Sequence, residues 1–277
     1  TKDGLGGIDP AELEQSLFEL WIKEELFPLT MLNSCYRSTP TLVELYNYFY
    51  GGKLVCKREV SQLINKHSLM VIDTHKIADS AEEKAGTSWL NTLETDICGY
   101  ILDALAKITA LGAGNIGFIS PYKAQVRDLR EIIFKWLREK CSQNNDFLLR
   151  HSIMQNNFGT AWPFQGREME MTMVSLVRTD PSKGTFYRPQ MLHVITSRSR
   201  NFLIVVFNSR AFKDREGDVG GFVRHMLTLV KTKGRYIELI PGGRLSDIPL
   251  RDYIEAVKSA YPMDAKQDTF VSFVDKY

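Results

Sequence analysis

Residues 115–119 read NIGFI, and residues 120–125 continue with SPYKAQ into an amphipathic segment that extends to residue 140. A short apolar run bounded by turn residues is typical of a buried strand, and the apolar spacing after it predicts a helix. The same alternation recurs along the chain, with further strands expected at 68–72, 169–177, 201–207 and 236–240 and further helices at 91–111 and 220–232. This pattern predicts an α/β fold with a mainly parallel sheet covered on both faces.

Helical segments are also expected on either side of this core. Residues 9–25 begin with Asp-Pro and continue with helical spacing, and residues 40–49 form a second amphipathic segment that the glycines at 51–52 end. A last helix is predicted at 249–261. Because ligands of parallel sheets lie beyond the carboxyl ends of the strands, the loops after Ile72, Ile119 and Phe207 are candidate binding positions.

The composition excludes several classes of protein. The 277 residues include 35 basic and 33 acidic side chains, so the net charge is +2 and gives no general attraction to nucleic acid. No stretch approaches the ~20 apolar residues of a membrane helix, so we expect no membrane partner. The cysteines are far apart and lack metal-ligand spacing, which predicts no metal site and an intracellular, cytoplasmic or nuclear location; they are Cys35, Cys56, Cys98 and Cys141.

A phosphate-binding P-loop is missing from the sequence. The nearest candidate, GGKL at 51–54, has no glycine five residues before Gly52, and Leu54 stands where the motif needs a hydroxyl. Residues 69–73, LMVID, imitate a Walker B strand, but Thr74 follows in place of a second acid, so we interpret them as a buried strand. We therefore predict that this chain alone hydrolyses no nucleotide.

Several motifs place arginines beside aromatic residues or glycines. Their order and spacing resemble the second RecA-like domain of superfamily 1 helicases of the Upf-one-like group, to which the nonsense-mediated-decay helicase and senataxin belong. The matching segments are SLFEL at 16–20, LNSCYRSTP at 32–40, NYFYGGKL at 47–54, GFISPYKAQ at 117–125, FQGRE at 164–168, VSLVR at 174–178 and LHVITSRSR at 192–200.

The resemblance implies a RecA-like, P-loop-NTPase-type three-layer α/β/α domain that lacks its own P-loop. It implies an ATP-dependent helicase activity once this domain is joined to a first, N-terminal RecA-like domain, which would carry the ligands for Mg²⁺ that accompanies ATP. The other expected partners are single-stranded RNA or DNA and proteins that dock on the terminal helices. The implied division is a leading helix and linker at 1–25, the second RecA-like domain at 26–240 and a C-terminal extension with one helix at 241–277.

Two arginines occupy the motif positions that reach the γ-phosphate of ATP across the interdomain cleft, and these are Arg37 and Arg198. A guanidinium suits this role because its rigid fork meets phosphate oxygens in pairs and stays charged. The resemblance further implies that Tyr36 stacks on adenine, that Gly166 allows the backbone to approach the phosphates and that Glu168 accepts hydrogen bonds from ribose. The other expected ATP contacts are Gln165 and Arg200.

A second group of residues matches positions that hold single-stranded nucleic acid. Ser120, Pro121 and Tyr122 directly follow an expected strand, where a hydroxyl and free backbone N–H groups can bind a phosphate without reading sequence. Thr160 matches a second position of this kind. We expect such binding to depend on salt and to tolerate any sequence.

Two departures from the family pattern leave other functions open. Trp162-Pro163 stands where the family has an acid and a small residue, and His193 replaces an Asn. One alternative is a helicase-derived interaction scaffold without ATPase activity, although retention of the arginines and Glu168 argues against it. Another is a nucleic-acid-binding domain without motor activity, which would require tight binding by this chain alone.

Overall fold

The computed structural model describes residues 16–25, 27–77, 81–106, 115–140, 157–180 and 187–261. The chain consists of two compact units, Thr1–Ser34 and Cys35–Tyr277. Among the described residues, no helix has the length and apolar character that crossing a bilayer requires.

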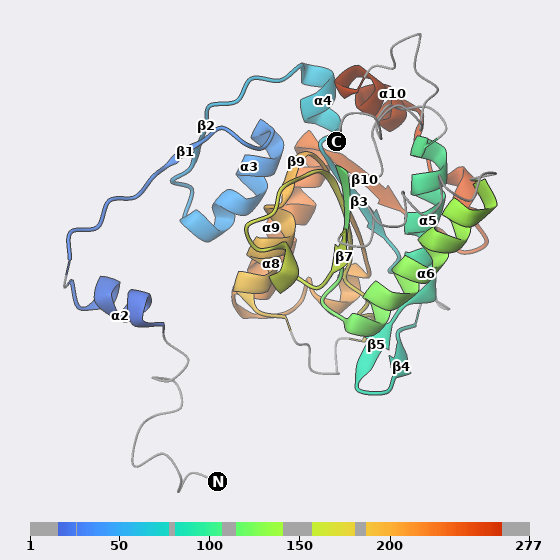
Figure 1. The fold of residues 1–277 in the computed structure, drawn as a ribbon, viewed down its shortest axis with the longest axis horizontal. Coiled ribbons are helices and arrows are strands. Elements are labelled where there is room, and N and C mark those ends of the chain that lie inside the picture. Colours follow the sequence, from blue (N-terminus) through green and yellow to red (C-terminus); the bar gives the residue numbers. More distant parts are fainter. Residues whose placement is uncertain are drawn as a thin grey trace, which may run out of the picture. The chain divides into compact units, whose positions relative to one another are not determined.

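A six-stranded sheet forms the centre of the larger unit (Figure 1). Its strands lie in the order β10-β3-β9-β8-β6-β7, and every neighbouring pair is parallel. The α/β fold predicted from the sequence is therefore confirmed. The strands are β3 (Leu69–Asp73), β6 (Ile116–Ile119), β7 (Phe158–Gly159), β8 (Met169–Ser175), β9 (Ser199–Phe207) and β10 (Arg235–Glu238).

Helices cover both faces of this sheet and complete three layers (Figure 1). One face carries α3 (Pro40–Tyr46), α8 (Pro189–Thr196) and α9 (Gly217–Lys233), which share one hydrophobic cluster. The other face carries α5 (Thr92–Ala106), α6 (Lys123–Lys140) and α10 (Arg251–Ala260), which share a second cluster.

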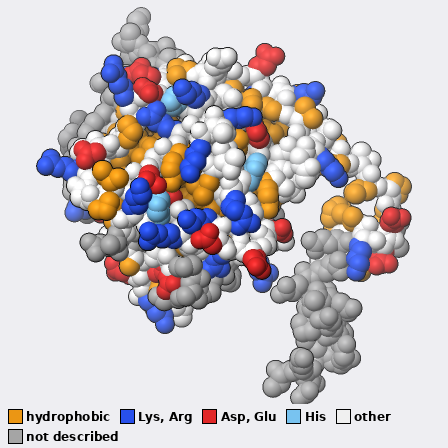
Figure 2. All heavy atoms as spheres, turned by 180° about the vertical axis from the view of Figure 1, so that it is seen from behind, with side chains coloured by type: hydrophobic (Ala, Val, Ile, Leu, Met, Phe, Trp, Pro, Cys, Tyr) orange, Lys and Arg blue, Asp and Glu red, His pale blue; other side chains and the backbone are white. Residues whose placement is uncertain are grey.

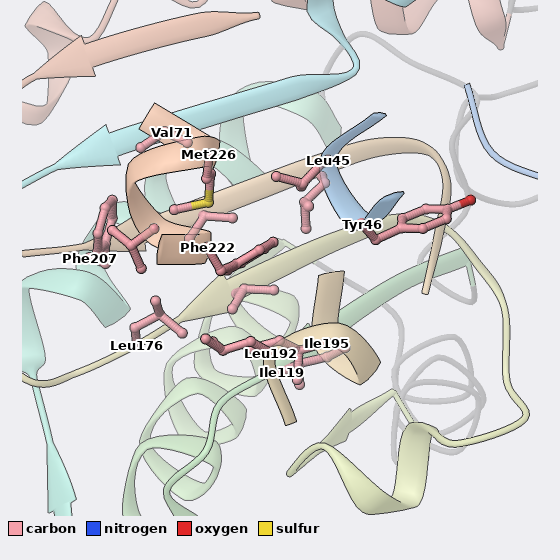
Figure 3. Packing of buried hydrophobic residues seen from close by; sticks show 14 of the residues in the cluster. Leu45, Tyr46, Val71, Ile119, Leu176, Leu192, Ile195, Phe207, Phe222 and Met226 are labelled. Atoms are coloured by element: carbon pink, nitrogen blue, oxygen red, sulfur yellow. The ribbon is translucent and has the colours of Figure 1, made fainter. Parts of the chain in front are cut away.

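Alternation along the strands explains why the sheet is buried on both sides. In β3, Leu69 and Val71 belong to the first cluster, whereas Met70 and Ile72 belong to the second. A strand turns successive side chains to opposite faces, so a continuous apolar run serves both layers. Figure 3 shows Phe222 of α9 among the buried side chains of the first cluster. Burial of each such side chain stabilises the fold by about 1.5–3 kcal/mol.

Several boundaries agree with the sequence-based expectations. The helix expected after residue 122 is α6, and the strands expected at 68–72 and 201–207 are β3 and β9. Gly51 ends the 3-10 turn Asn47–Tyr50 in the left-handed conformation, with φ of 58°, as the glycine pair predicts. Residues 107–111 of the helix expected at 91–111, and residues 9–15 of the one expected at 9–25, lie outside the described residues.

The structure also contains elements that the sequence analysis did not predict. They include β7, the helix α8, the short helix α4 (Gln62–His67), the two-stranded pair of β1 (Ser34–Cys35) and β2 (Val55–Cys56), and the hairpin of β4 (Glu83–Ala85) and β5 (Ser88–Leu90). The hairpin turns at Gly86, whose φ is +63°, a backbone conformation that glycine adopts without strain.

The smaller unit, Thr1–Ser34, contains α2 (Leu17–Lys23). Trp21 and Phe27 pack edge to face, with ring centroids 5.5 Å apart. Leu17 and Phe18 of this helix are exposed.

Candidate functional site

The amino ends of β8 and β9 bring together three of the residues expected to contact ATP. Glu168 immediately precedes β8, and Arg198 immediately precedes β9. The N–H of Met169 donates to the carbonyl of Arg198 at 3.0 Å and so aligns the two strand starts. Arg37, 131 positions before Glu168 in the chain, places its Nη1 3.3 Å from Glu168 Oε1. Motifs that are far apart in sequence thus meet at the amino ends of these two neighbouring strands.

Arg198 is held in place by backbone carbonyls. Its Nε donates to Val194 O at 2.9 Å, and its Nη1 donates to Phe164 O and Arg167 O at 3.3 and 3.4 Å. Burial and then the nearby charge of Arg37 lower the pKa of Arg198 from its usual value, which still leaves a guanidinium charged at neutral pH. The contacts fix a positive charge between α8 and the FQGRE loop.

Arg37 is less constrained than Arg198. Its ion pair with Glu168 is partly exposed, with side-chain exposures of 29% and 47%, and pairs of this kind stabilise a protein by only about 0–1 kcal/mol. The Nε–H of Arg37 is buried without a hydrogen-bond partner. An unsatisfied N–H on a weakly paired guanidinium fits a polyanionic ligand such as a nucleotide phosphate.

The remaining expected ATP residues flank this cluster. Tyr36 is 69% exposed, which leaves its side chain available for stacking. Gly166 has φ of +82° with open space where a Cβ would stand, and Gln165 ends the 3-10 turn Trp162–Phe164 through its N–H on Trp162 O. Arg200 instead pairs with Glu170, Nη1 to Oε1 at 3.2 Å.

Arg58 is a contact residue that the sequence analysis missed. Its Nη1 donates to the carbonyls of Arg37 at 2.7 Å and Arg200 at 2.9 Å, and its Nη2 donates to Asn201 Oδ1 at 2.5 Å. A single guanidinium therefore ties the Tyr36-Arg37 loop to the start of β9. Its sequence context after β2 gives no signal of this role, because the partners are up to 143 positions away.

The candidate nucleic-acid residues meet at the opposite end of the sheet, where the carboxyl ends of the strands lie. Ile119 of β6 is in register with Gly159 of β7, so Ser120 and Thr160 follow two adjacent carboxyl ends. Ser120 and Tyr122 are buried, however; Ser120 Oγ accepts the N–H of Tyr122 at 3.4 Å. Pro121 is also buried, whereas Thr160 is partly exposed.

The two sets of candidates therefore lie at opposite ends of the parallel strands, the first at the amino ends of β8 and β9 and the second at the carboxyl ends of β6 and β7. The expectation of ligand residues at the carboxyl ends applies to Ser120 and Thr160, whereas the candidate ATP residues lie at the amino ends. Asp73, the last residue of β3, is fully buried and accepts hydrogen bonds from the N–H groups of His75 and Ser209 and from the hydroxyl of Tyr236. These contacts support the interpretation of residues 69–73 as a structural strand.

A buried ion pair lies behind the carboxyl end of β8. Arg178 Nε donates to Glu82 Oε1 at 3.0 Å, and both side chains are at most 3% exposed. Glu82 also accepts hydrogen bonds from the N–H groups of Thr179 and Asp180, while the guanidinium lies 4.7 Å from the ring centroid of Trp89. The pair therefore holds the backbone of Thr179 and Asp180, which directly follow the VSLVR motif.

Glu94 of α5 contacts the same segment. Its Oε2 accepts the hydroxyl of Ser175 at 2.5 Å and the N–H of Val177 at 2.9 Å. Burial raises the pKa of Glu94 to about 8, although these hydrogen bonds oppose the rise. Its Oε1 is buried without a partner, which is consistent with a protonated carboxyl. Val177 has φ of 69°, so Glu94 holds an unusual backbone conformation.

A metal site does not emerge from the described part of the chain, where no group of three or more His, Cys, Asp or Glu side chains could hold an ion. Figure 2 shows Lys and Arg side chains interspersed with Asp and Glu on one face, and the net charge of the chain is only +2. The positive charge at the site is therefore local.

The domain has three layers, a parallel sheet between two layers of helices, and arginines from separate motifs gather at the amino ends of neighbouring strands. This arrangement defines a RecA-like domain. A family model described as an AAA domain, AAA_12, matches residues 13–210. The chain belongs to this family, and its relatives place it among the superfamily 1 helicases of the Upf-one-like group. The resemblance that the motifs indicate is confirmed.

The similar proteins are much longer than this chain. Regulator of nonsense transcripts 1 of Dictyostelium discoideum is 31% identical over 213 residues, which cover 72% of this chain and 15% of the relative. ATP-dependent helicase upf1 of Schizosaccharomyces pombe is 27% identical over 243 residues, covering 82% and 24%. Putative helicase mov-10-B.1 of Danio rerio is 28% identical over 207 residues, covering 65% and 19%. The chain thus spans less than a quarter of each relative.

Proposed function

We propose that this chain is the C-terminal RecA-like half of an ATP-dependent superfamily 1 helicase, in which Arg37 and Arg198 act on the phosphates of ATP. The convergence of both arginines with Glu168 at the amino ends of β8 and β9 carries this proposal. A protein that served only as a scaffold would not need two arginines, 161 positions apart in the sequence, to converge at the same strand ends. The chain alone would be inactive, because it has no P-loop.

The two arginines have different tasks in this proposal. Arg198 is already fixed by three carbonyls, so it presents charge at a set position and needs little reorganisation, which is how electrostatic catalysis works. Arg37 exchanges Glu168 for a phosphate oxygen, which frees the Glu168 carboxylate to accept hydrogen bonds from ribose. ATP with Mg²⁺ supplies the phosphoryl group, and the ligands for the ion lie on the first RecA-like domain.

The other candidates orient the nucleotide around these charges. Tyr36 offers its exposed ring to adenine, and the open backbone at Gly166 admits the phosphates, with Gln165 beside it. Arg200 would have to leave Glu170 to contact ATP, so it contributes least. Binding of ATP closes the two halves and hydrolysis reopens them.

Single-stranded RNA or DNA is the proposed nucleic-acid partner, held at the carboxyl ends of β6 and β7. Because the side chains of Ser120, Pro121 and Tyr122 are buried, their contribution would come through the backbone of this loop. The partly exposed Thr160 would add its hydroxyl. Such contacts give binding that depends on salt and not on sequence.

The proposed division keeps residues 1–25 as leading helix and linker, 26–240 as the RecA-like domain and 241–277 as an extension. The N-terminal RecA-like domain of the same protein is the main partner, in a cytoplasmic or nuclear setting. The exposed Leu17 and Phe18 of α2 favour a second candidate function, a protein-docking scaffold without ATPase activity.

Substitution of Arg198 tests the proposal in the full-length protein with both halves. We expect Arg198→Ala to lower nucleic-acid-stimulated ATP hydrolysis by roughly 10³-fold or more, as loss of an arginine finger does, and Arg198→Lys to recover little of it. Lys258→Ala is the matched control, since Lys258 pairs only locally on α10 with Glu255. Hydrolysis by Arg198→Ala within twofold of wild type would favour the scaffold.

A further inference from the structure

Two thiols lie on neighbouring strands beside the Tyr36-Arg37 loop. Cys35 ends β1 and Cys56 ends β2, and the two strands form a two-stranded sheet. The N–H of Lys57 donates to the carbonyl of Cys35 at 2.8 Å. Neighbouring strands lie ~4.8 Å apart, inside the Cα separation of ~4.4–6.8 Å that a disulfide needs.

Both sulfur atoms contact the same residue. Cys35 Sγ is hydrogen-bonded to the backbone of Ser38, and Cys56 Sγ lies 3.7 Å from the carbonyl oxygen of Ser38. Both side chains are only partly buried and pack against the same hydrophobic cluster. The two thiols therefore lie on the same side of the strand pair, and neither side chain is fully buried.

The surroundings of Cys35 stabilise a negative charge on its sulfur. The hydroxyl of Tyr46 lies 3.1 Å from Cys35 Sγ. Burial raises the pKa of Cys35, but the hydrogen bonds from Tyr46, Ser38 and Arg37, together with the charge of Arg37, outweigh burial and lower this pKa. By contrast, burial raises the pKa of Cys98, which is fully enclosed. Because the thiolate is the reactive form, the lowered pKa favours Cys35 as the attacking thiol.

We propose that Cys35 and Cys56 form a thiol modification site for a small soluble disulfide of the glutathione type, in which Cys35 attacks and Cys56 resolves. The Cys35 thiolate attacks one sulfur of oxidised glutathione, forms a mixed disulfide and releases one glutathione thiolate. Cys56, after losing its proton to solvent, attacks the Cys35 sulfur and releases the second glutathione. Two protein thiols become one disulfide while one glutathione disulfide becomes two thiols.

The site adjoins the residues proposed to bind ATP. Cys35 directly precedes Tyr36 and Arg37, and Cys56 lies two positions before Arg58, which holds the carbonyl of Arg37. A bond between the sulfurs would tie the strand that precedes Arg37 covalently to the strand that precedes Arg58. This regulatory consequence rests on the proposed function, whereas the thiol chemistry does not.

The test follows the thiols by mass spectrometry in this chain, without nucleotide. Cys141, which lies outside the described residues, is replaced by Ser in every variant. With excess oxidised glutathione at pH 7, we expect the parent protein to pass through a glutathione adduct to an internal Cys35–Cys56 disulfide that dithiothreitol reverses. Cys56→Ser should stop at one stable adduct on Cys35, and Cys35→Ser should react at least tenfold more slowly.

Two further measurements separate the role of the fold from plain thiol exposure. Tyr46→Phe keeps the ring but removes the hydroxyl, so it should slow adduct formation severalfold. In denaturant, Cys35 and Cys98 should react at equal rates. A stable adduct in the parent protein would overturn the resolving role of Cys56, and equal rates at Cys35 and Cys98 in the folded protein would overturn the site. Neither result bears on the Arg198→Ala experiment, so the two proposals fail separately.

Discussion

Glu94 provides the sharpest test of the buried polar network at the carboxyl end of β8, where its carboxyl contacts Ser175 and Val177. Its pKa is about 8 in the folded protein, against an ordinary value of 4.5. Between these values the folded state keeps a proton that the unfolded state has lost, so the free energy of unfolding falls as pH rises through this window. Stability from this group is greatest at low pH.

Replacement by Gln removes this titration while keeping the shape of the protonated side chain. Each pH unit inside the window changes the free energy of unfolding by about 1.4 kcal/mol. From pH 5 to pH 8 the wild type should therefore lose roughly 3 to 4 kcal/mol that Glu94→Gln retains. The carbonyl oxygen of Gln still accepts the hydroxyl of Ser175 and the N–H of Val177.

Urea unfolding at pH 5, 6, 7 and 8 measures the difference between the two proteins. His67 and His193, whose pKa values burial lowers, titrate in both proteins and cancel in the comparison. Glu131→Gln is the matched control, because Glu131 lies on the exposed side of α6 with 70% side-chain exposure. Stability curves of wild type and Glu94→Gln that run parallel from pH 5 to pH 8 would refute the reasoning.

Two further substitutions probe the charged contacts around the sites. Glu82→Gln should lower the free energy of unfolding by about 3–5 kcal/mol, because it leaves the Arg178 guanidinium buried without its counter-charge; a loss below about 1 kcal/mol in urea unfolding would contradict the buried pair. In the protein with both halves, Arg58→Ala should lower kcat for ATP hydrolysis about 10²-fold through misplacement of Arg37, with little change in the KM for ATP. Arg58→Lys should recover only part of kcat, since an ammonium lacks the fork that reaches three acceptors. If both variants instead lower Tm as well, and kcat falls in proportion to that loss of stability, Arg58 has a structural role alone.

The regular core could be predicted from the sequence because its periodicity is strong. The helix at Lys123–Lys140 and the strand Leu69–Asp73 follow from apolar spacing and from an uninterrupted apolar run. The strand β7 could not be found this way, because its two residues, Phe158–Gly159, are too few to show any period. The hairpin turn at Gly86 did carry a signal, a glycine between two short segments, that the sequence analysis did not use.

The candidate site was predictable only as a list of residues. Motif order identified Arg37, Glu168 and Arg198, and the structure shows where Arg37 and Glu168 touch. Periodicity says nothing about loops, so the burial of Ser120 and Tyr122 could not be foreseen. Arg58 lies outside every motif and acquires its contacts only when the chain folds.

The seven residues of β8 separate the two ends of the sheet by a fixed length. At ~3.3 Å per residue, the strand extends about 20 Å from the Glu168 end to the Ser175 end. A hydrogen-bonded parallel strand neither stretches nor compresses appreciably, so it acts as a strut. If the proposed sites are correct, a displacement at the arginines would be transmitted to the proposed nucleic-acid end of the sheet with little change in the length of the strand.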